Sequence, residues 1–315
     1  MQSSFAPVVG YSPTYSFAFG AGWFFNGGVA AGRLVGIYAL ANAFQLQPQV
    51  TLKVTPWVEW DIDSTLQRGF EPYFGEGSRT RVADRHDIHA FRSETTTGIR
   101  FHPSESTSIS PRIGLRTYHL ANPGPPVAPR GRRLVSPTLG LNFRWDLRGR
   151  EAQDKDLGLF HETELWWSPP GWSEATGESF LTAETRFTYG VPLVLGAKLV
   201  ATINLGASAG NPDYAYRFKL GGSSRLRGYS DNRFRGKFFY LHGTELRVPL
   251  SGMFSVAGFG TFGEARDNLV RIQPRFSYGG GLRAALPPDR VQWARLDVGI
   301  GEDSWGFYAD FGLPF

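Results

Sequence analysis

Two histidines and two aspartates lie within residues 84–89 and form the first group in this sequence that could carry out chemistry. The run reads Asp84-Arg-His-Asp-Ile-His89. On an extended strand Asp87 and His89 share one face, because side chains two positions apart point the same way. Asp84 and His86 then share the other face. An Asp–His pair could act as a general base, as in a hydrolase, or the cluster could bind a metal. The alternative is a polar hairpin whose side chains are solvated. No second cluster supplies further ligands, so we expect the hairpin and no metal site.

Other features that can mark an enzyme are weak here. The remaining histidines are scattered singly, and none is singled out as half of a His–Ser pair. The glycine-rich stretches Gly20-Ala-Gly22 and Gly279-Gly-Gly281 do not open a helix. We therefore expect them to relieve crowding in strands rather than to hold phosphate. The sequence predicts a protein that is not an enzyme and that uses no cofactor.

Strands must position these side chains, because hydrophobicity alternates with a period of two over most of the chain. Residues 135–147, 181–191 and 193–205 place apolar side chains at most odd positions and polar or charged ones between them. Charges in a membrane strand are tolerable only where they face the lumen. We therefore predict an all-β fold, a transmembrane antiparallel β-barrel that spans residues 1–315 as a single domain. The spacing predicts fourteen to sixteen strands, with sixteen preferred, and leaves the strand positions within 44–91 open.

The end of the chain shows the alternation most clearly. Phe307, Phe311 and Phe315 lie on one apolar face, and Asp310 lies on the interleaved face. One face would therefore meet lipid and the other the lumen. The three phenylalanines resemble the terminal-strand signal by which barrel substrates are recognised during their assembly. Pro314 has no backbone N–H, so it should weaken barrel closure near the end of this strand.

The composition agrees with a barrel and limits the classes of partner that we expect. Aromatic residues make up 15% of the chain and glycines number 39, as aromatic girdles and glycine-rich turns would require. The absence of cysteine excludes a disulfide framework. The net charge of +5 is carried mostly by arginines inside alternating strands, apart from Arg130-Gly-Arg132-Arg133, which favours a polar lumen over nucleic-acid binding. No stretch approaches 18 apolar residues, so no transmembrane helix is expected. The start lacks a signal-peptide pattern, so we expect a mature form. No linker or composition shift divides the chain, so we expect no soluble periplasmic domain.

Five motifs follow one another over roughly the last hundred residues. They are Gly221-Gly-Ser-Ser-Arg-Leu-Arg-Gly-Tyr229, Glu245-Leu-Arg-Val-Pro-Leu250, Gly279-Gly-Gly-Leu-Arg283, Arg295-Leu-Asp-Val-Gly299 and Phe307-Tyr-Ala-Asp-Phe-Gly-Leu-Pro-Phe315. In this order they resemble the BamA/TamA-like outer-membrane assembly and secretion superfamily, the bacterial surface antigen barrels. The resemblance is to a short form without the periplasmic POTRA domains.

The resemblance implies an external loop, about 207–236, that folds into the lumen and carries Arg227, Gly228 and Tyr229 at its tip. Burying an unpaired guanidinium is costly, so Arg227 needs a carboxylate partner. The apolar positions of the strand that follows are Phe238, Tyr240, Leu246, Val248 and Leu250, which leaves Glu245 and Arg247 facing the lumen. Glu245 could then accept two parallel hydrogen bonds from the Arg227 guanidinium, and this bidentate pair would pin the loop to the wall.

The chain departs from the family pattern at one position near this loop. The family supplies an aspartate in a Phe-x-Asp-x-Gly pattern, and the matching stretch here is Phe259-Gly-Thr-Phe-Gly263. Thr261 therefore removes one carboxylate, unless Glu264, Asp297 or Asp310 substitutes. We expect Asp297, with Glu245 and Arg247, among the wall residues that hold the loop. The alternative is an ordinary turn with a solvated cation, and a pinned loop could also be purely architectural.

The resemblance implies a bacterial outer-membrane barrel that inserts, assembles or secretes other proteins. A weakly paired seam between the first and last strands would give it a physical basis, because a free edge can pair with an incoming strand. The expected partners are outer-membrane lipids including lipopolysaccharide, and a separate periplasmic or lipoprotein chain, with no nucleic acid. One alternative is a plugged barrel that serves as membrane anchor or structural subunit of a larger complex. A less favoured one is an outer-membrane hydrolase built on residues 84–89.

Overall fold

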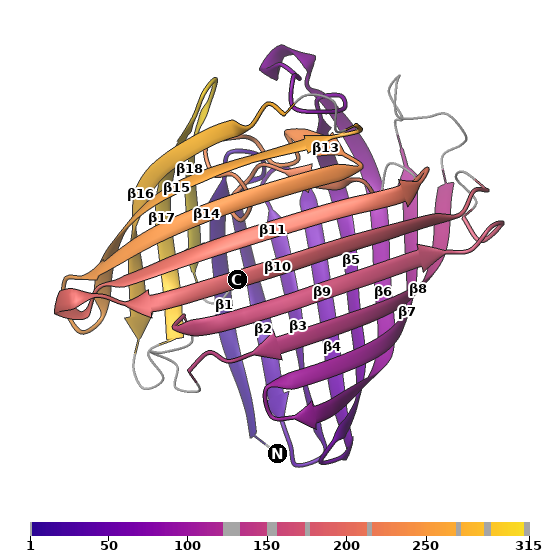
Figure 1. Cartoon of the computed structure of the whole chain (residues 1–315), viewed down its shortest axis with the longest axis horizontal. Coiled ribbons are helices and arrows are strands. Elements are labelled where there is room, and N and C mark those ends of the chain that lie inside the picture. Colours follow the sequence, from indigo (N-terminus) through magenta and orange to yellow (C-terminus); the bar gives the residue numbers. More distant parts are fainter. Residues whose placement is uncertain are drawn as a thin grey trace.

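In the described part of the chain, sixteen antiparallel strands close into a barrel (Figure 1). The computed structural model describes residues 2–121, 133–149, 156–173, 177–212, 216–268, 272–286 and 291–311. Barrel strands that follow one another in the chain are paired, β11 pairs with β14, and β1 closes the barrel against β18. The predicted all-β barrel of sixteen strands is thereby confirmed. No helix in these ranges is long and apolar enough to cross a membrane.

The described barrel strands have between 7 and 19 residues, and two strands of 3 residues lie apart from them. The barrel consists of β1 (Gln2–Ser12), β2 (Ser16–Asn26), β3 (Ala30–Ala39), β4 (Ala43–Thr55), β5 (Val58–Tyr73), β6 (His86–Ser104), β7 (Thr107–Leu120), β8 (Arg133–Asp146), β9 (Gly158–Ser168), β10 (Phe180–Pro192), β11 (Lys198–Gly210), β14 (Phe238–Pro249), β15 (Phe254–Arg266), β16 (Arg275–Leu286), β17 (Val291–Gly301) and β18 (Trp305–Phe311). A separate two-stranded sheet is formed by β12 (Phe218–Leu220) and β13 (Phe234–Gly236), and short 3-10 helices lie at η1 (Val82–Asp84) and η3 (Val194–Gly196).

The two ends of the barrel differ in the length of their connections. At the end where the N-terminus lies, β4 ends at Thr55 and β5 already begins at Val58. At the opposite end, residues 74–85 join β5 to β6 and residues 211–237 join β11 to β14. Outer-membrane barrels have short periplasmic turns and longer external loops. The opposite end is therefore external, and the segment 211–237, named the lumen loop below, enters the barrel from outside.

The outer face of the barrel is apolar and the inner face is polar. On β8, Leu139 and Leu141 are exposed, whereas Thr138 and Asn142, which flank this stretch, are buried. The predicted segments 135–147 and 181–191 agree with β8 and β10 to within two residues. A closed barrel satisfies every backbone group without water, which is why strands can cross a membrane only in this form. The architecture places the chain in a bacterial outer membrane.

The structure corrects two predicted boundaries. The strand predicted at 193–205 begins only at Lys198, because a tight turn precedes it. In that turn Leu195 has a φ of 57° and is 92% exposed. The residues of the turn continue the apolar pattern, so alternation alone could not mark where the strand starts. Because β11 also ends later than predicted, the loop predicted at 207–236 occupies 211–237.

The seam between β1 and β18 is paired over a short stretch in the described residues. Its register consists of Val9 with Phe311, Gly10 with Asp310 and Tyr11 with Ala309. On its other side β1 pairs with β2 over its whole length. β1 ends one residue beyond Tyr11, so the external start of β18 has no residue of β1 directly opposite it. An aromatic contact supports this part of the seam, since the rings of Tyr11 and Phe307 lie 5.6 Å apart.

The wall opposite the seam is held by an aromatic side chain that lies over two glycines. Trp166 of β9 points into the barrel and crosses Gly140 of β8 towards Gly114 of β7. A Cβ added at Gly140 would lie 2.4 Å from the Trp166 ring, and one at Gly114 would lie 3.0 Å from it. Glycine at these positions is required by the close approach of the indole, not by backbone conformation.

We expect Gly140→Ala to destabilise the barrel, because the new methyl group forces the Trp166 ring out of its position. The free energy of unfolding should fall by about 1–3 kcal/mol, as for overpacked sites. Urea unfolding in detergent, followed by tryptophan fluorescence, measures this. The matched control is Gly258→Ala on the exposed face of β15, where an added Cβ meets nothing within 4 Å. Equal losses in the two variants would contradict the assignment.

Candidate functional site

The lumen loop packs against the inner wall formed by β14 and β15. Two short stretches of the loop pair with each other as strands β12 and β13. The apolar side chains of the loop are buried together with three apolar side chains of the wall. This cluster consists of Phe218, Leu220, Leu226, Tyr229 and Phe234 from the loop, with Phe239, Leu241 and Ala265 from the wall. Burying these side chains stabilises the inward position of the loop, because apolar surface is removed from the aqueous lumen.

The tip of the loop places Arg227 between two carboxylates from different strands. Its Nη1 donates to Asp297 Oδ2 of β17 at 2.7 Å, and its Nη2 donates to Glu245 Oε2 of β14 at 2.9 Å. The guanidinium carbon lies 3.4 Å from the centroid of the Phe259 ring on β15. The Asp297 side chain is fully buried. One arginine therefore bridges three strands of the wall through charge-assisted bonds and a cation–π contact.

The other predicted wall residues lie close by and have different partners. Arg247 donates to Glu245 at 2.7 Å and to Asp156 at 2.5 Å, but it does not bond to the loop tip. Thr261, which stands where the family has its aspartate, shares a 2.5 Å hydrogen bond with Ser277. Asp297 is thus the carboxylate that takes its place beside Arg227.

The two remaining candidates for that role are engaged elsewhere. Glu264 accepts a hydrogen bond from Ser78 at 3.2 Å. Asp310 accepts one from Arg295 at 3.0 Å. Neither carboxylate is bonded to Arg227 among the described residues.

Arg283 of β16 completes this cluster, although the sequence did not single it out. Its side chain is 4% exposed and contacts both carboxylates that hold Arg227. Nη2 lies 3.1 Å from Glu245, and Nη1 donates to Asp297. The residue belongs to one of the quoted motifs, and alternation places it on the lumen side. Sequence spacing cannot tell which arginines of different strands meet the same carboxylate.

The backbone at Gly228 fits directly against the last two strands. Its φ is +104°, and a Cβ there would lie 2.7 Å from the backbone of Ile300 and Gly301. Its N–H donates to the Tyr308 hydroxyl at 3.0 Å, and its carbonyl accepts from Ser304 Oγ at 2.7 Å. Only glycine combines this conformation with so close an approach. Tyr308 is a contact that sequence reasoning missed.

Tyr229 fixes the other side of the tip. Its hydroxyl donates to the carbonyl of Phe276 at 3.0 Å and accepts from the N–H of Glu302 at 3.0 Å. Its carbonyl accepts from the Tyr308 hydroxyl at 3.1 Å. Its ring packs edge-on against Phe234 with centroids 5.1 Å apart. The three tip residues thereby contact β14, β16, β17 and β18.

A second charged cluster holds the loop at the external end. Arg235 bonds to Glu71 of β5, and both side chains are buried. Lys219 Nζ lies 2.7 Å from the same carboxylate. The external loop 74–85 crosses above, where Gly77 N–H donates to the Arg235 carbonyl at 2.6 Å. The lumen loop is therefore enclosed between wall and external loop (Figure 1).

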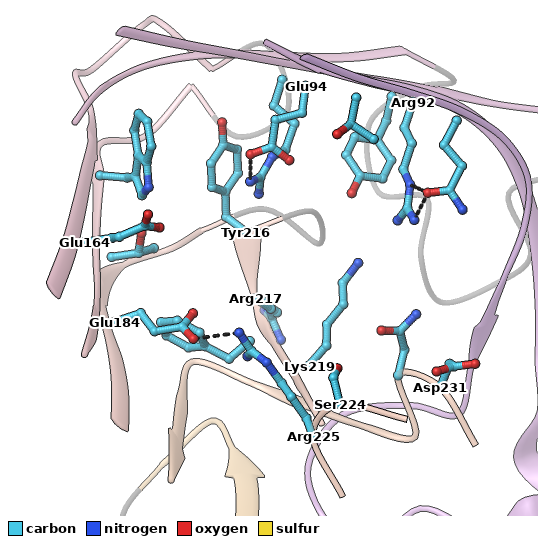
Figure 2. A pocket seen from close by; sticks show the side chains of 18 of the residues that line it. Arg92, Glu94, Glu164, Glu184, Tyr216, Arg217, Lys219, Ser224, Arg225 and Asp231 are labelled. Atoms are coloured by element: carbon cyan, nitrogen blue, oxygen red, sulfur yellow. Dashed lines mark hydrogen bonds and ion pairs between the residues drawn. The ribbon is translucent and has the colours of Figure 1, made fainter. Parts of the chain in front are cut away.

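The loop leaves a polar chamber of about 510 Å³ between itself and the wall on the β4–β10 side (Figure 2). Arg225 of the loop crosses it and donates to Glu184 of the wall at 2.6 Å. Burial raises the pKa of the Asp231 carboxyl on the loop above its usual range. The side chains around this chamber carry charges of both signs, so it is suited to water and polar groups rather than to an apolar ligand.

The cluster at 84–89 does not form an Asp–His pair. The Asp84 carboxylate accepts from the Arg81 N–H at 2.8 Å, and the Asp87 carboxylate accepts from Arg85 at 2.8 Å. His86 and His89 are exposed. No group of three or more His, Asp or Glu residues suited to a metal ion occurs in the described ranges.

One serine in β11 lies in a Gly-x-Ser-x-Gly stretch. Residues 206–210 read Gly-Ala-Ser-Ala-Gly, the pattern of a nucleophile elbow, but they lie within strand β11 rather than at a strand-to-helix turn.

Of the three phenylalanines predicted as the terminal-strand signal, Phe307 is 37% exposed on the outer face of β18. The backbone of Phe311 pairs with Val9 across the seam. Its side chain, Pro314 and Phe315 lie outside the described residues.

No protein-family model matches the sequence, and no curated protein is significantly similar to it. Solved structures do match, over almost the whole chain. BamA from Haemophilus ducreyi lacking POTRA domains 1–3 has a TM-score of 0.71 at 13% identity, over 99% of this chain and 70% of that one. CdiB from Acinetobacter baumannii has a TM-score of 0.65 at 14% identity, over 99% and 60%. CdiB from Escherichia coli has a TM-score of 0.67 at 13% identity, over 98% and 63%.

At these identities the likeness concerns the fold. The chain spans less than two thirds of the length of either CdiB structure. Within that span the strand number and the closed topology agree with the fold that the sequence motifs predict. The chain has the sixteen-stranded outer-membrane barrel fold of BamA and CdiB.

Proposed function

We propose that this barrel handles other proteins, by inserting, assembling or secreting them at the outer membrane. The observation that carries the proposal is at the seam, where the external start of β18 extends beyond the last residue of β1. A complete barrel abolishes free strand edges, and this extension of β18 leaves one. An incoming strand could pair with the external part of β18, since β1 ends at Ser12.

The lumen loop is coupled to this seam in the proposed function. Its tip is bonded to Tyr308 of β18 and to Ser304 in the turn before it. Gly299 of β17 also approaches the tip so closely that an added Cβ would lie 2.7 Å from Gly228 N. Any movement of β18 during strand exchange must therefore change the contacts of the loop tip. We propose that Arg227, held by Glu245 and Asp297, anchors the loop during this movement.

We also propose that a separate periplasmic or lipoprotein chain delivers substrates to the barrel. The short-turn end of the barrel is where such a chain would meet it. A co-purifying chaperone-like protein would support this arrangement.

A second candidate function is that of a plugged barrel that anchors a larger complex. The enclosed loop favours it, because Arg233 and Arg235 are each 1% exposed and are held by wall or external-loop groups. Such a barrel would be isolated in a stable assembly with no effect on other outer-membrane proteins.

Depletion of the protein in its own cells separates these functions. We expect several outer-membrane proteins to fall in abundance if the barrel inserts or assembles them, as quantitative proteomics of outer membranes would show. Loss of one surface component alone would indicate a dedicated exporter or anchor. An unchanged outer-membrane proteome would contradict protein handling altogether.

Locking the seam should abolish the activity, because strand exchange requires β1 and β18 to separate. The chain has no cysteine, so Tyr11→Cys with Ala309→Cys introduces a single disulfide across directly opposed residues. We expect the abundance of substrate proteins to fall as on depletion, and a reductant to restore it. The control pair is Phe19→Cys with Tyr38→Cys, which are opposed in the fully formed β2–β3 ladder. Full activity of the oxidised seam variant would exclude strand exchange.

Arg227→Lys should fail to replace arginine at the loop tip, because an ammonium cannot direct parallel donors to Asp297 and Glu245. We expect a loss of about 1–3 kcal/mol in the free energy of unfolding, since Arg283 still neutralises part of both carboxylates. Arg186→Lys is the control, because this half-exposed arginine has one carboxylate partner, Glu162. Urea titration measures stability, and protease cleavage within the lumen loop reports its release. Wild-type protection in Arg227→Lys would argue against the anchor.

A further inference from the structure

The external rim of strands β5 to β8 presents cations towards the membrane. Arg68 of β5 is opposed to Phe91 of β6, which is opposed to His119 of β7, which is opposed to Arg133 of β8. Directly opposed residues in an antiparallel sheet point to the same face. Phe91 is 46% exposed on the outer face, so all four side chains lie on the outside of the barrel.

These side chains lie at the external boundary of the barrel. Arg133 is the first residue of β8 and His119 is the second-last residue of β7. Just above the row, His89 is exposed on β6 and the guanidinium of Arg85 lies 5.8 Å from the Phe70 ring. These four strands lie side by side in Figure 1, with their external ends towards the loops at the top.

The two arginines of the row differ in their contacts from the arginine next to them. Arg68 and Arg133 are both exposed, and neither forms an ion pair with another described residue. In contrast, Arg85 next to them is paired with Asp87 at 2.8 Å. An unpaired guanidinium at the edge of lipid is unfavourable unless an anion meets it, because lipid cannot solvate the charge.

Several other strands carry aromatic side chains on the outer face at the same level. Tyr240, Phe276 and Tyr278 face outward near the external ends of β14 and β16, and Phe19 and Tyr38 do so on β2 and β3. Such aromatic side chains are the ordinary girdle of a membrane barrel. The cations on β5 to β8 therefore form a distinct patch rather than part of a uniform rim.

We propose that this patch, defined by Arg68, His119 and Arg133, binds the phosphate groups of lipopolysaccharide in the outer leaflet. The guanidinium fork matches phosphate geometry and holds it through two parallel hydrogen bonds. The patch faces the membrane side, so its ligand must be a lipid headgroup rather than a soluble anion. Phe44 and Phe91, which flank Arg68 at 42% and 46% exposure, contact the acyl chains below the headgroup.

The spacing of the patch fits a headgroup with two phosphates. Arg68 and Arg133 lie three strands apart, which corresponds to about 14 Å at the ~4.8 Å spacing of neighbouring strands. A disaccharide phosphorylated at both ends can reach both arginines, with His119 between them as a further donor. A phospholipid with one phosphate can engage only one of the two.

Native mass spectrometry of the full folded chain with added diphosphoryl lipid A tests the proposal. We expect Arg68→Gln with Arg133→Gln to weaken lipid A binding at least about tenfold, since each arginine contributes charge-assisted hydrogen bonds. Removal of both phosphates from the lipid should weaken binding to the wild-type chain by a similar factor. The control is Lys237→Gln, which removes a cation next to the external end of β14 and should bind as the wild type does.

Folding is checked by heat-modifiable migration on gels, and Arg68→Lys with Arg133→Lys provides a variant that keeps the charges. This variant should bind more weakly than the wild type and more tightly than the glutamine variant. Binding that is equal for lipid A with and without phosphates would overturn the proposal, as would unchanged binding in the glutamine variant. Displacement of lipid A by equimolar inorganic phosphate would show a site for the free ion and would also overturn it.

Discussion

The structure depends on the neutralisation of one guanidinium inside the lumen. Arg227 reaches the wall only because Glu245 and Asp297, from strands β14 and β17, meet it at 2.9 and 2.7 Å. A charge taken out of water without such partners would be strongly destabilising. The position of the lumen loop and the close approach of its glycine tip to β17 depend on this contact, together with the buried apolar cluster and the Arg235–Glu71 pair. Arg283 shares both carboxylates, so the cluster is a network rather than a single pair.

The second constraint is closure of the sheet. Membrane strands must pair on both sides, and here the external start of β18 extends beyond the last residue of β1. Tyr308 links the two constraints, because the same strand that closes the barrel also holds the loop tip through its hydroxyl. A barrel arranged in this way can exchange strands only with a change in its own lumen. This coupling is the physical basis of the proposed protein-handling function. A plugged barrel that serves only as an anchor would not need it.

The outer surface adds a third level of organisation. The outward side chains of most strands are apolar or aromatic, as lipid requires. On β5 to β8 the external rim carries arginines that form no ion pair within the described part of the chain, and lipid phosphates are their proposed partners. Arginines on the two faces of the barrel therefore have different partners. In the lumen, carboxylates of the wall neutralise them, whereas on the outer face their proposed partners are phosphates of the outer leaflet.

The sequence by itself determined the class of fold and the lumen-facing position of Glu245, and it limited the strand number to fourteen to sixteen. A period of two is a local pattern, and it indicates directly which side chains face the lumen and which face lipid. It also indicated the loop and its tip through the ordered motifs. It could not locate the start of β11, since apolar residues continue through the turn at Leu195. Only the tertiary structure decided that Asp297 replaces the carboxylate missing at Thr261, that Arg283 and Tyr308 join the site, and that Arg68 and Arg133 share a row. These contacts join residues far apart in the chain, and their geometry is set by strand register and barrel closure, which no local pattern encodes.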